Sequence, residues 1–342
     1  MKRYMTGLMA GLLLVLGGCS KPREVTTAFY LWKSVWTPQD LDTVYLKKLN
    51  TKKLYVRFFD IDDQGKGPVP VGTIALENPK LPGLTVVPVV FITNRTFLNR
   101  TPEALDLLAE RTVAKITALS EMLSLAKSVE YQFDCDWTAG TKGAYFSFLD
   151  KVRQRQPGIR LSCTIRLHQV KYVLKMGVPP VDKGVLMYYA STEPTDFKAR
   201  NSILENTEAA KYIGTMKDYP KPLDIALPLF SWAIVQNPFG KIKLINGVRN
   251  AELQNKPDLY EPEEKNFYRV LKPHYLKGMW LNAGFMIKVE EVEQATLQEA
   301  AQTLKAQLNQ ESTEIIFYHL DHDLQQRYPA DIVQQLLNTF AS

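Results

Sequence analysis

The sequence has little cysteine and no long basic stretch, and each shortage excludes a class of protein. Its 342 residues carry a formal net charge of +6, spread over the chain without a basic run interleaved with aromatics, so we expect no nucleic-acid partner. Cys135 and Cys163 fall on consecutive predicted strands, where buried free thiols are expected rather than a disulfide. No metal-ligand spacing is present. We expect a monomer that needs neither a metal nor a cofactor.

Long apolar runs are also scarce. The run from Gly7 to Gly18 follows two basic residues and is too short for a comfortable membrane span. It ends in Leu16-Gly17-Gly18-Cys19, which resembles the bacterial lipobox and implies cleavage before Cys19 and a lipid on its sulfur. We therefore expect a lipoprotein signal peptide at 1–18, a lipidated linker at 19–25, and anchoring in the bacterial cell envelope, at the outer membrane. An ordinary signal peptide or an anchor helix is the alternative.

From residue 26 to residue 342, short β-rich runs alternate with helical stretches, which is typical of repeated βα units around a parallel sheet. Eight such strands in a chain of this length favour an α/β fold of the (β/α)8 TIM-barrel type over an open doubly wound sheet. The predicted strands are 28–32, 53–62, 84–93, 129–138, 159–166, 184–191, 223–232 and 314–320. The predicted helices are 39–49, 101–126, 142–154 and 294–308.

One segment interrupts the repeat. Residues 236–292 are too long for a βα loop and contain a further predicted strand at 282–289. We interpret the segment as a small subdomain inserted after strand seven, covering one side of the barrel mouth. A separate domain is disfavoured, because the helix 294–308 and the strand 314–320 follow it and are needed to close the barrel.

The strand 129–138 ends in two carboxylates, Asp134 and Asp136. Side chains alternate across a strand, so both lie on one face. A buried unpaired charge is costly, which predicts that this face is the floor of a polar site. Arg166 continues the polar face on the next strand and is expected to hold one of the pair ionised. The alternative is an Arg166-paired network with a purely structural role.

Several segments resemble one family. Residues 133–138 are similar to the strand-four signature of chitinase-like family 18 glycoside hydrolases, residues 186–189 to its strand-six Met/Tyr segment and 226–232 to its strand-seven segment. Residues 317–323 resemble its final strand, with Tyr318 in place of the tryptophan at the floor of a sugar subsite. The resemblance is closer still to an uncharacterised group of bacterial glycosidase-like barrels that share a Gln-x-Asp-x-Asp signature. It implies a carbohydrate ligand.

The chain departs from the chitinase pattern at its catalytic position. Thr138 stands where the family has its acidic glutamate, and threonine cannot act as a general acid near neutral pH. We therefore do not expect chitinase-type chemistry. The first hypothesis is a glycoside hydrolase that uses other carboxylates at strand ends. Asp136 is the predicted central catalytic group, Asp134 its partner, and Glu193 a weaker candidate for the acid.

Further residues near strand ends are candidates for substrate binding. Their rings can stack on sugar faces or their polar groups can line the cleft, although each aromatic is equally compatible with the barrel core. These candidates are Trp137, Tyr189, Trp232, Tyr318, Arg166, Asp60 and Asp321. The second hypothesis is a catalytically inactive carbohydrate-binding or scaffold lipoprotein that keeps this cleft.

Overall fold

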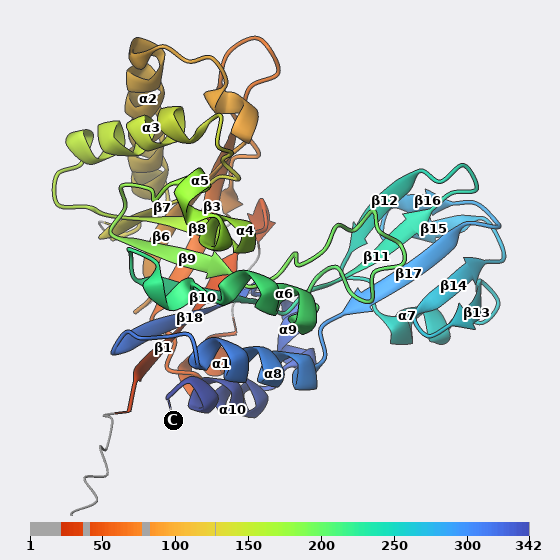
Figure 1. Cartoon of the computed structure of the whole chain (residues 1–342). Helices are drawn as coiled ribbons and strands as arrows, with labels where there is room; N and C mark the ends of the chain where they lie inside the picture. The colour runs from red at the N-terminus through yellow and green to blue at the C-terminus, as the bar shows by residue number, and fades with distance from the viewer. Residues whose placement is uncertain (1–21, 37–41, 77–82, 127, 342) are drawn as a thin grey trace, which may run out of the picture.

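The computed structural model describes residues 22–36, 42–76, 83–126 and 128–341 (Figure 1). The predicted signal peptide, Cys19 and most of the predicted linker lie outside these residues, as do the first residues of the predicted helix 39–49.

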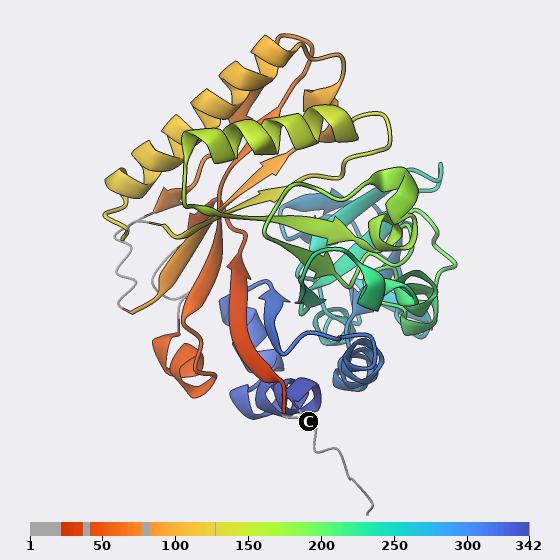
Figure 2. The same ribbon diagram turned by 60° about the vertical axis from the view of Figure 1, so that its left-hand side comes forward.

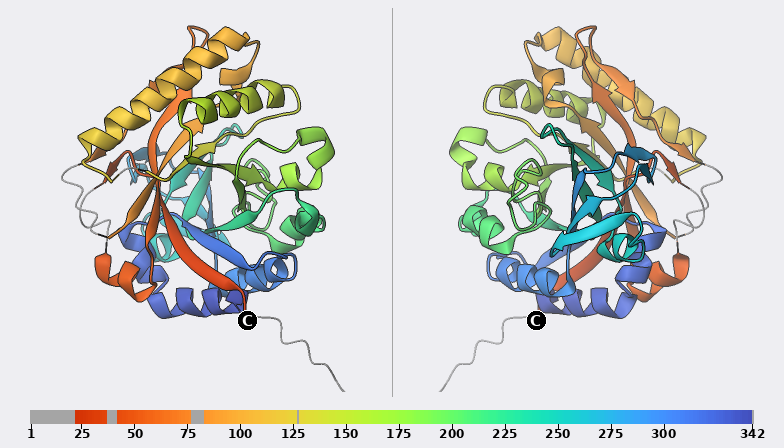
Figure 3. Two further views of the ribbon diagram at one scale, coloured as in Figure 1. Left: turned by 90° about the vertical axis from the view of Figure 1, so that its left-hand side faces the viewer. Right: turned by 90° about the vertical axis from the view of Figure 1, so that its right-hand side faces the viewer.

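Eight parallel strands form a closed barrel, as predicted. Its strand order is β1-β18-β10-β9-β8-β7-β6-β3, and β1 pairs with both β18 and β3, which closes the ring. Figure 3 shows the barrel from both ends, with helices around it. The strands are β1 (Glu24–Leu31), β3 (Lys53–Asp62), β6 (Thr85–Ile92), β7 (Glu130–Asp134), β8 (Arg160–Arg166), β9 (Lys183–Met187), β10 (Leu223–Pro228) and β18 (Ser312–Tyr318).

Helices cover the outside of the barrel, and α2 and α3 lie side by side on one flank (Figure 2). Thr101 caps α2 through its hydroxyl and Pro102 is its first residue, the start signal that the sequence predicts. None of the helices in the described part of the chain is long and apolar enough to cross a membrane. The helices are α1 (Thr43–Lys48), α2 (Pro102–Met122), α3 (Lys142–Arg155), α4 (Leu167–Lys171), α5 (Val173–Met176), α6 (Asn206–Ile213), α8 (Gln294–Lys305), α9 (His322–Arg327) and α10 (Ala330–Ala341).

The main hydrophobic core fills the layer between these helices and the strands. Cys135 and Cys163 are buried in it as free thiols, as expected from the sequence. Short strands and 3-10 helices lie between the main elements of the barrel. They are β2 (Val35–Trp36), β4 (Val69–Val71), β5 (Ala75–Leu76), η2 (Asn94–Phe97) and η3 (Met216–Asp218).

An antiparallel subdomain follows β10 and projects from the carboxyl ends of the barrel strands (Figure 1). Its five-stranded sheet has the order β12-β11-β17-β14-β13 and packs around a separate hydrophobic core. Its elements are β11 (Ser231–Gln236), β12 (Ile242–Asn246), α7 (Asn250–Gln254), β13 (Tyr260–Glu264), β14 (Phe267–Val270), β15 (His274–Leu276), β16 (Met279–Leu281) and β17 (Met286–Glu291).

The predicted seventh strand, 223–232, is two elements in the structure. Strand β10 ends at Pro228, and Leu229 still donates its N–H to the Tyr318 carbonyl oxygen at 2.7 Å. From Ser231 the chain turns into β11, which pairs antiparallel with β12 and β17. The apolar run continues across this switch because both strands are buried, so composition alone does not reveal the boundary.

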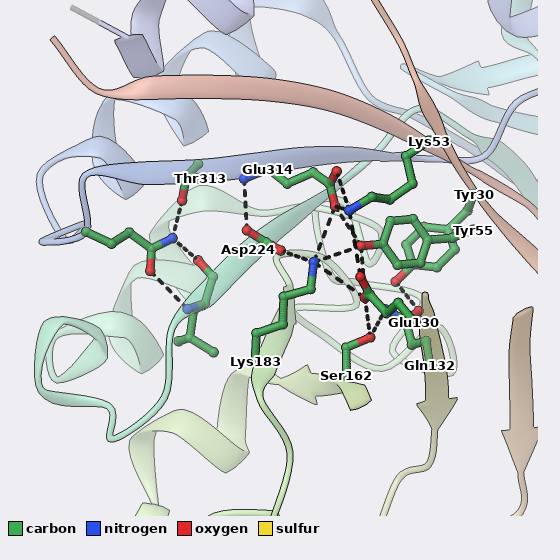
Figure 4. A network of polar contacts seen from close by, with 12 residues as sticks. Tyr30, Lys53, Tyr55, Glu130, Gln132, Ser162, Lys183, Asp224, Thr313 and Glu314 are labelled. Carbon is green, nitrogen blue, oxygen red and sulfur yellow. Dashed lines mark hydrogen bonds and ion pairs between the residues drawn. The ribbon is translucent and has the colours of Figure 1, made fainter. Parts of the chain in front are cut away.

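A charged network fills the barrel interior at the amino-terminal ends of the strands (Figure 4). Lys183 Nζ lies 2.7 Å from Asp224 Oδ2, 3.4 Å from Glu130 Oε1 and 3.5 Å from Glu314 Oε2. Lys53 approaches Glu314 at 3.0 Å and Glu130 at 3.7 Å. Burial lowers the pKa of Lys183, but the surrounding carboxylates, Asp224 first, more than offset this and hold its pKa above the usual value. Lys183 is therefore the central cation of three buried carboxylates.

Replacing this cation is predicted to destabilise the fold. In Lys183→Met, the carboxylates lose their main counter-charge while they stay buried, so we expect the free energy of unfolding to fall by about 3 to 5 kcal/mol. Urea unfolding measures the change. Lys211→Met is the control, because Lys211 pairs with Glu208 on the surface and its loss is expected to cost less than about 1 kcal/mol. Equal effects of the two substitutions would contradict the role of Lys183.

Candidate functional site

A cavity of about 460 Å³ opens at the carboxyl ends of the barrel strands, beside the subdomain. This is the end at which TIM barrels carry their active sites, and the volume suits a small ligand. A larger cavity of about 970 Å³ lies at the opposite end and is lined by Lys53, Lys183, Asp224 and Glu314. Those charges already pair with one another. The smaller cavity is therefore the candidate site.

Asp134, the last residue of β7, forms part of the cavity wall and is only 3 % exposed. Burial raises the pKa of Asp134 to about 6, although the nearby Arg166 opposes the shift. Asp136 and Asp60 add to the increase through like-charge repulsion, whereas a hydrogen bond from Thr164 Oγ1 at 2.6 Å opposes it. A carboxyl group with this pKa can carry a proton to a ligand near neutral pH.

Asp136 and Arg166 form the predicted ion pair at the rim. The guanidinium nitrogens Nε and Nη2 of Arg166 each donate to one carboxylate oxygen of Asp136, and the Nη2–Oδ2 distance is 3.1 Å. The Asp136 side chain is 51 % exposed, and it is Arg166 rather than Asp136 that lines the cavity. The sequence predicts Asp136 as the central group and Asp134 as its partner. The geometry favours the reverse order.

Two more predicted carboxylates, Asp60 and Asp321, line the cavity. Asp60 near the end of β3 accepts hydrogen bonds from Arg57 on both oxygens, one of them at 2.7 Å. Asp321 caps α9 by accepting from the Leu324 N–H at 2.7 Å, and it lies 3.7 Å from His319 Nε2. Within the described ranges, no group of three or more His, Cys, Asp or Glu residues forms a metal site.

Three predicted aromatic residues, Tyr189, Trp232 and Tyr318, also line the cavity, together with Trp32 and Phe230. Tyr318 lies at the centre of this group, with its ring 5.7 Å from those of Trp32 and Tyr189 and 5.6 Å from that of Phe230. The hydroxyl of Tyr189 is buried and has no hydrogen-bond partner among the described residues. Buried polar groups normally find a partner, so this hydroxyl is available to a ligand or to water.

A buried ion pair in the subdomain fixes the position of Trp232. Glu290 Oε2 accepts the Trp232 indole N–H at 2.8 Å and the Ser202 backbone N–H at 2.9 Å. Its other oxygen lies 2.7 Å from Lys288 Nζ, with both side chains almost fully buried. Lys288 also donates to the Ala199 carbonyl oxygen. The subdomain therefore holds the 199–202 loop and one aromatic wall of the cavity together.

Trp137 was wrongly predicted to bind substrate. Its side chain is fully buried beneath α3, where it stacks on Tyr145 with a centroid distance of 5.3 Å and donates to the Met176 carbonyl oxygen at 3.0 Å. Strand β7 ends at Asp134, before Trp137 and earlier than the predicted end at residue 138, and Trp137 lies in the same hydrophobic core as Phe133 and Cys135.

Glu193 also lies away from the predicted position. The chain turns after β9 at Ala190, where φ is 53°, and the following loop carries Glu193 to the surface. Glu193 is exposed and does not line the cavity, which leaves Asp134 as the better candidate for the acid.

Several residues of the cavity wall are not predicted from the sequence. Arg249 and Asn246 come from the subdomain, whose strands carry no repeat that aligns them with the barrel. Arg327 comes from α9, beyond the last strand. A search for basic residues within ten positions of each strand end would have found Arg327. No pattern in the sequence places Arg249 at the mouth.

No protein-family model matches the sequence, and no curated protein matches it either. Solved structures do. A chitinase from Bacteroides thetaiotaomicron is similar with a TM-score of 0.56 and 12 % identity over 93 % of this chain and 97 % of the other. The Bacillus cereus spore cortex-lytic enzyme SleL has a TM-score of 0.53 and 14 % identity over 94 % of this chain and 76 % of the other. A chitinase from Chromobacterium violaceum has a TM-score of 0.53 and 12 % identity over 91 % of this chain and 98 % of the other.

The chain has the barrel fold of these glycoside hydrolases. At such low identity the likeness establishes the fold alone, and the chemistry of this cavity has to be argued from its own residues.

The elevated pKa of Asp134 predicts a pH-dependent stability. Between about pH 4 and pH 6 the unfolded chain has lost this proton while the folded chain keeps it, so stability falls as pH rises through that window. The effect is on the order of 3 kcal/mol. Asp134→Asn removes it, so the variant should gain stability relative to wild type between about pH 4 and about pH 7, measured by urea unfolding. Asp150→Asn, an exposed position on α3, is the control and should follow wild type. Parallel curves for wild type and Asp134→Asn would argue against a raised pKa.

Proposed function

We propose that this chain is a carbohydrate-directed barrel that hydrolyses a glycosidic bond in the cavity at the carboxyl ends of its strands. The observation that carries the proposal is the protonatable Asp134, buried in a cavity whose wall combines aromatic rings with carboxylates. The barrel shared with chitinases and a spore cortex-lytic enzyme supports it. Stacked aromatic faces suit sugar rings, and a carboxylate pair suits acid/base catalysis.

In this proposal Asp134 is the general acid that protonates the leaving glycosidic oxygen. Asp60 is the second carboxylate, because it lines the same cavity and is close enough to raise the pKa of Asp134. Asp60 forms an ion pair with Arg57, and in this role it would activate a water molecule or stabilise positive charge on the sugar ring. Tyr318 would provide the aromatic floor on which the sugar stacks.

A second candidate function is carbohydrate binding without turnover. It is favoured by Thr138, which stands in place of the acid of the chitinase pattern and whose hydroxyl forms a hydrogen bond with that of Thr141. It is also favoured by Asp136, whose two oxygens are held by Arg166. In that case the cavity and its aromatic rings would serve recognition alone.

The two candidates separate in one experiment. The purified domain is screened for binding and for cleavage against a panel of oligosaccharides. We expect Asp134→Asn to lower turnover about 10² to 10⁴-fold because the acid is lost, with little change in affinity. Activity of the wild type should also fall as pH rises above about 6, when Asp134 loses its proton. Asp136→Asn is expected to have a smaller effect.

Asp150→Asn is the matched control for this screen, because it removes the same charge outside the cavity. Turnover that persists unchanged in Asp134→Asn would remove this residue from the mechanism. Binding that Tyr318→Ala weakens, without turnover by any form of the protein, would support the recognition role instead. Absence of both binding and turnover would refute a carbohydrate-directed function.

We also propose that the protein is a lipoprotein of the bacterial envelope, anchored in the outer membrane through Cys19. Arg23, shortly after this cysteine, donates to the carbonyl oxygens of Leu308 at 2.9 Å, Gln310 at 3.1 Å and Phe340 at 3.0 Å. The chain is thereby fixed at the amino-terminal end of the barrel, opposite the cavity. A lipid at Cys19 would keep that end near the membrane and turn the cavity away from it.

Cys19→Ser tests the anchor. We expect wild type to incorporate labelled palmitate and to sediment with outer membranes in a density gradient, and the variant to lose both properties because it lacks the acylated sulfur. Cys163→Ser, at a buried thiol, is the control and should keep the label. A Cys19→Ser variant that remains labelled and bound to outer membranes would contradict the proposal.

A further inference from the structure

Two arginines of the cavity wall have no carboxylate partner among the residues that the structure describes. Arg249, the residue before α7, and Arg327, the last residue of α9, both line the cavity, and neither takes part in an ion pair within the described chain. Arg327 donates from Nη2 to the Leu229 carbonyl oxygen, whereas its Nε is buried without a hydrogen-bond partner among those residues. By contrast, Arg166 is held on both sides by Asp136.

The carboxylates that line the cavity form hydrogen bonds with groups other than Arg249 and Arg327. Asp60 accepts from both arms of Arg57, and Asp321 accepts the N–H that begins α9. Asp134 accepts from Thr164, and the largest attractive interaction that acts on its charge comes from Arg166. The positive charges of Arg249 and Arg327 therefore remain without a fixed counter-charge in the wall.

Charges of both signs surround His319 in the cavity wall. Burial is the main cause that lowers the pKa of His319; Asp321 raises it, and Lys33 and Arg327 lower it by smaller amounts. His319 lines the cavity beside Arg327. A neutral imidazole and a guanidinium thus face the same space, and an anion that enters it gains attraction that is not already used by the protein.

We infer that the cavity selects an oligosaccharide that carries a carboxylate, and that Arg249 and Arg327 are the residues that bind it. The inference rests on the proposed carbohydrate-directed function and adds the class of sugar. A guanidinium presents a planar fork of donors that matches a carboxylate in two parallel hydrogen bonds. The buried Nε of Arg327 gains the partner that it lacks. Neutral hydroxyl groups would leave both charges without a counter-ion.

A sugar can carry this carboxylate in two ways. It can be a uronic acid, in which the exocyclic carbon C6 is oxidised to a carboxylate, or it can carry a lactyl ether on an N-acetylated sugar. Each has a neutral counterpart with the same β-1,4 backbone. We therefore choose four probes: a glucuronic acid oligomer and a glucose oligomer, and an alternating N-acetylglucosamine/N-acetylmuramic acid oligomer and an N-acetylglucosamine oligomer. The pair with the larger difference in affinity identifies the source of the carboxylate.

Binding of the four probes is measured by calorimetry with the full folded domain, with Arg249→Gln and Arg327→Gln, and with Arg111→Gln as control. Arg111 is exposed on α2, so its variant has the same net charge as the other two. We expect wild type to bind one acidic probe at least about tenfold more tightly than its neutral counterpart, with a preference that weakens in salt. Each cavity variant should lose most of this preference, Arg249→Lys and Arg327→Lys should retain part of it, and Arg111→Gln should keep it whole.

The outcomes distinguish the two levels of the proposal. Neutral probes bound as tightly as acidic ones, or an acidic preference that survives in both glutamine variants, would overturn the selection of a carboxylate and leave the carbohydrate-directed function intact. Failure of all four probes to bind wild type would count against the selection as well, and failure across the wider oligosaccharide panel would reject the proposed function itself. Circular dichroism of each variant excludes unfolding as the cause of a loss.

Discussion

The interior of the barrel depends on the compensation of charges that its closure buries. Lys183 is the clearest case, because three carboxylates from β7, β10 and β18 converge on its amino group. The next residue, Gly184, allows β9 to lie this close, since a Cβ there would come within 2.8 Å of the Leu223 side chain. Without this cation, three strands would bring three buried carboxylates together with less positive charge to compensate them.

Buried charges need compensation at both ends of the barrel interior, but the two ends differ in how complete that compensation is. At the amino-terminal end the hydroxyls of Tyr55 and Ser162 complete a network in which every charged group has a partner (Figure 4). At the carboxyl end compensation is partial: Arg166 serves Asp136 directly, and Asp134 is left with a raised pKa. A saturated network stabilises a fold and offers nothing to a ligand, whereas groups with unused capacity can bind and react. The smaller cavity is therefore the candidate site despite its size.

The sequence predicts the barrel well where its βα units carry a local signal. The strand 53–62 and the helix from Pro102 have period, composition and start signals that agree. The site was predictable where it follows from strand register, as for Asp134, Arg166 and Tyr318. The position of a site residue was not predictable where the chain leaves the barrel strands. Trp137 lies beyond the end of β7 and is buried beneath α3, Glu193 lies beyond a turn at Ala190, and Arg249 depends on a subdomain whose contacts are distant in sequence.

The subdomain is consequently a part of the site rather than an appendage. Its own hydrophobic core makes it a stable unit, but Glu290 and Lys288 on β17 are buried where it meets the 199–202 loop of the barrel. Breaking a buried pair costs more than a pair of surface charges contributes, so this contact has a strong preference for one arrangement. The same glutamate orients Trp232, and the strand that pairs with Trp232 leads directly to Arg249. The aromatic wall and the Arg249 guanidinium thus share one support in the insertion, whereas Asp134 and Arg327 belong to the barrel.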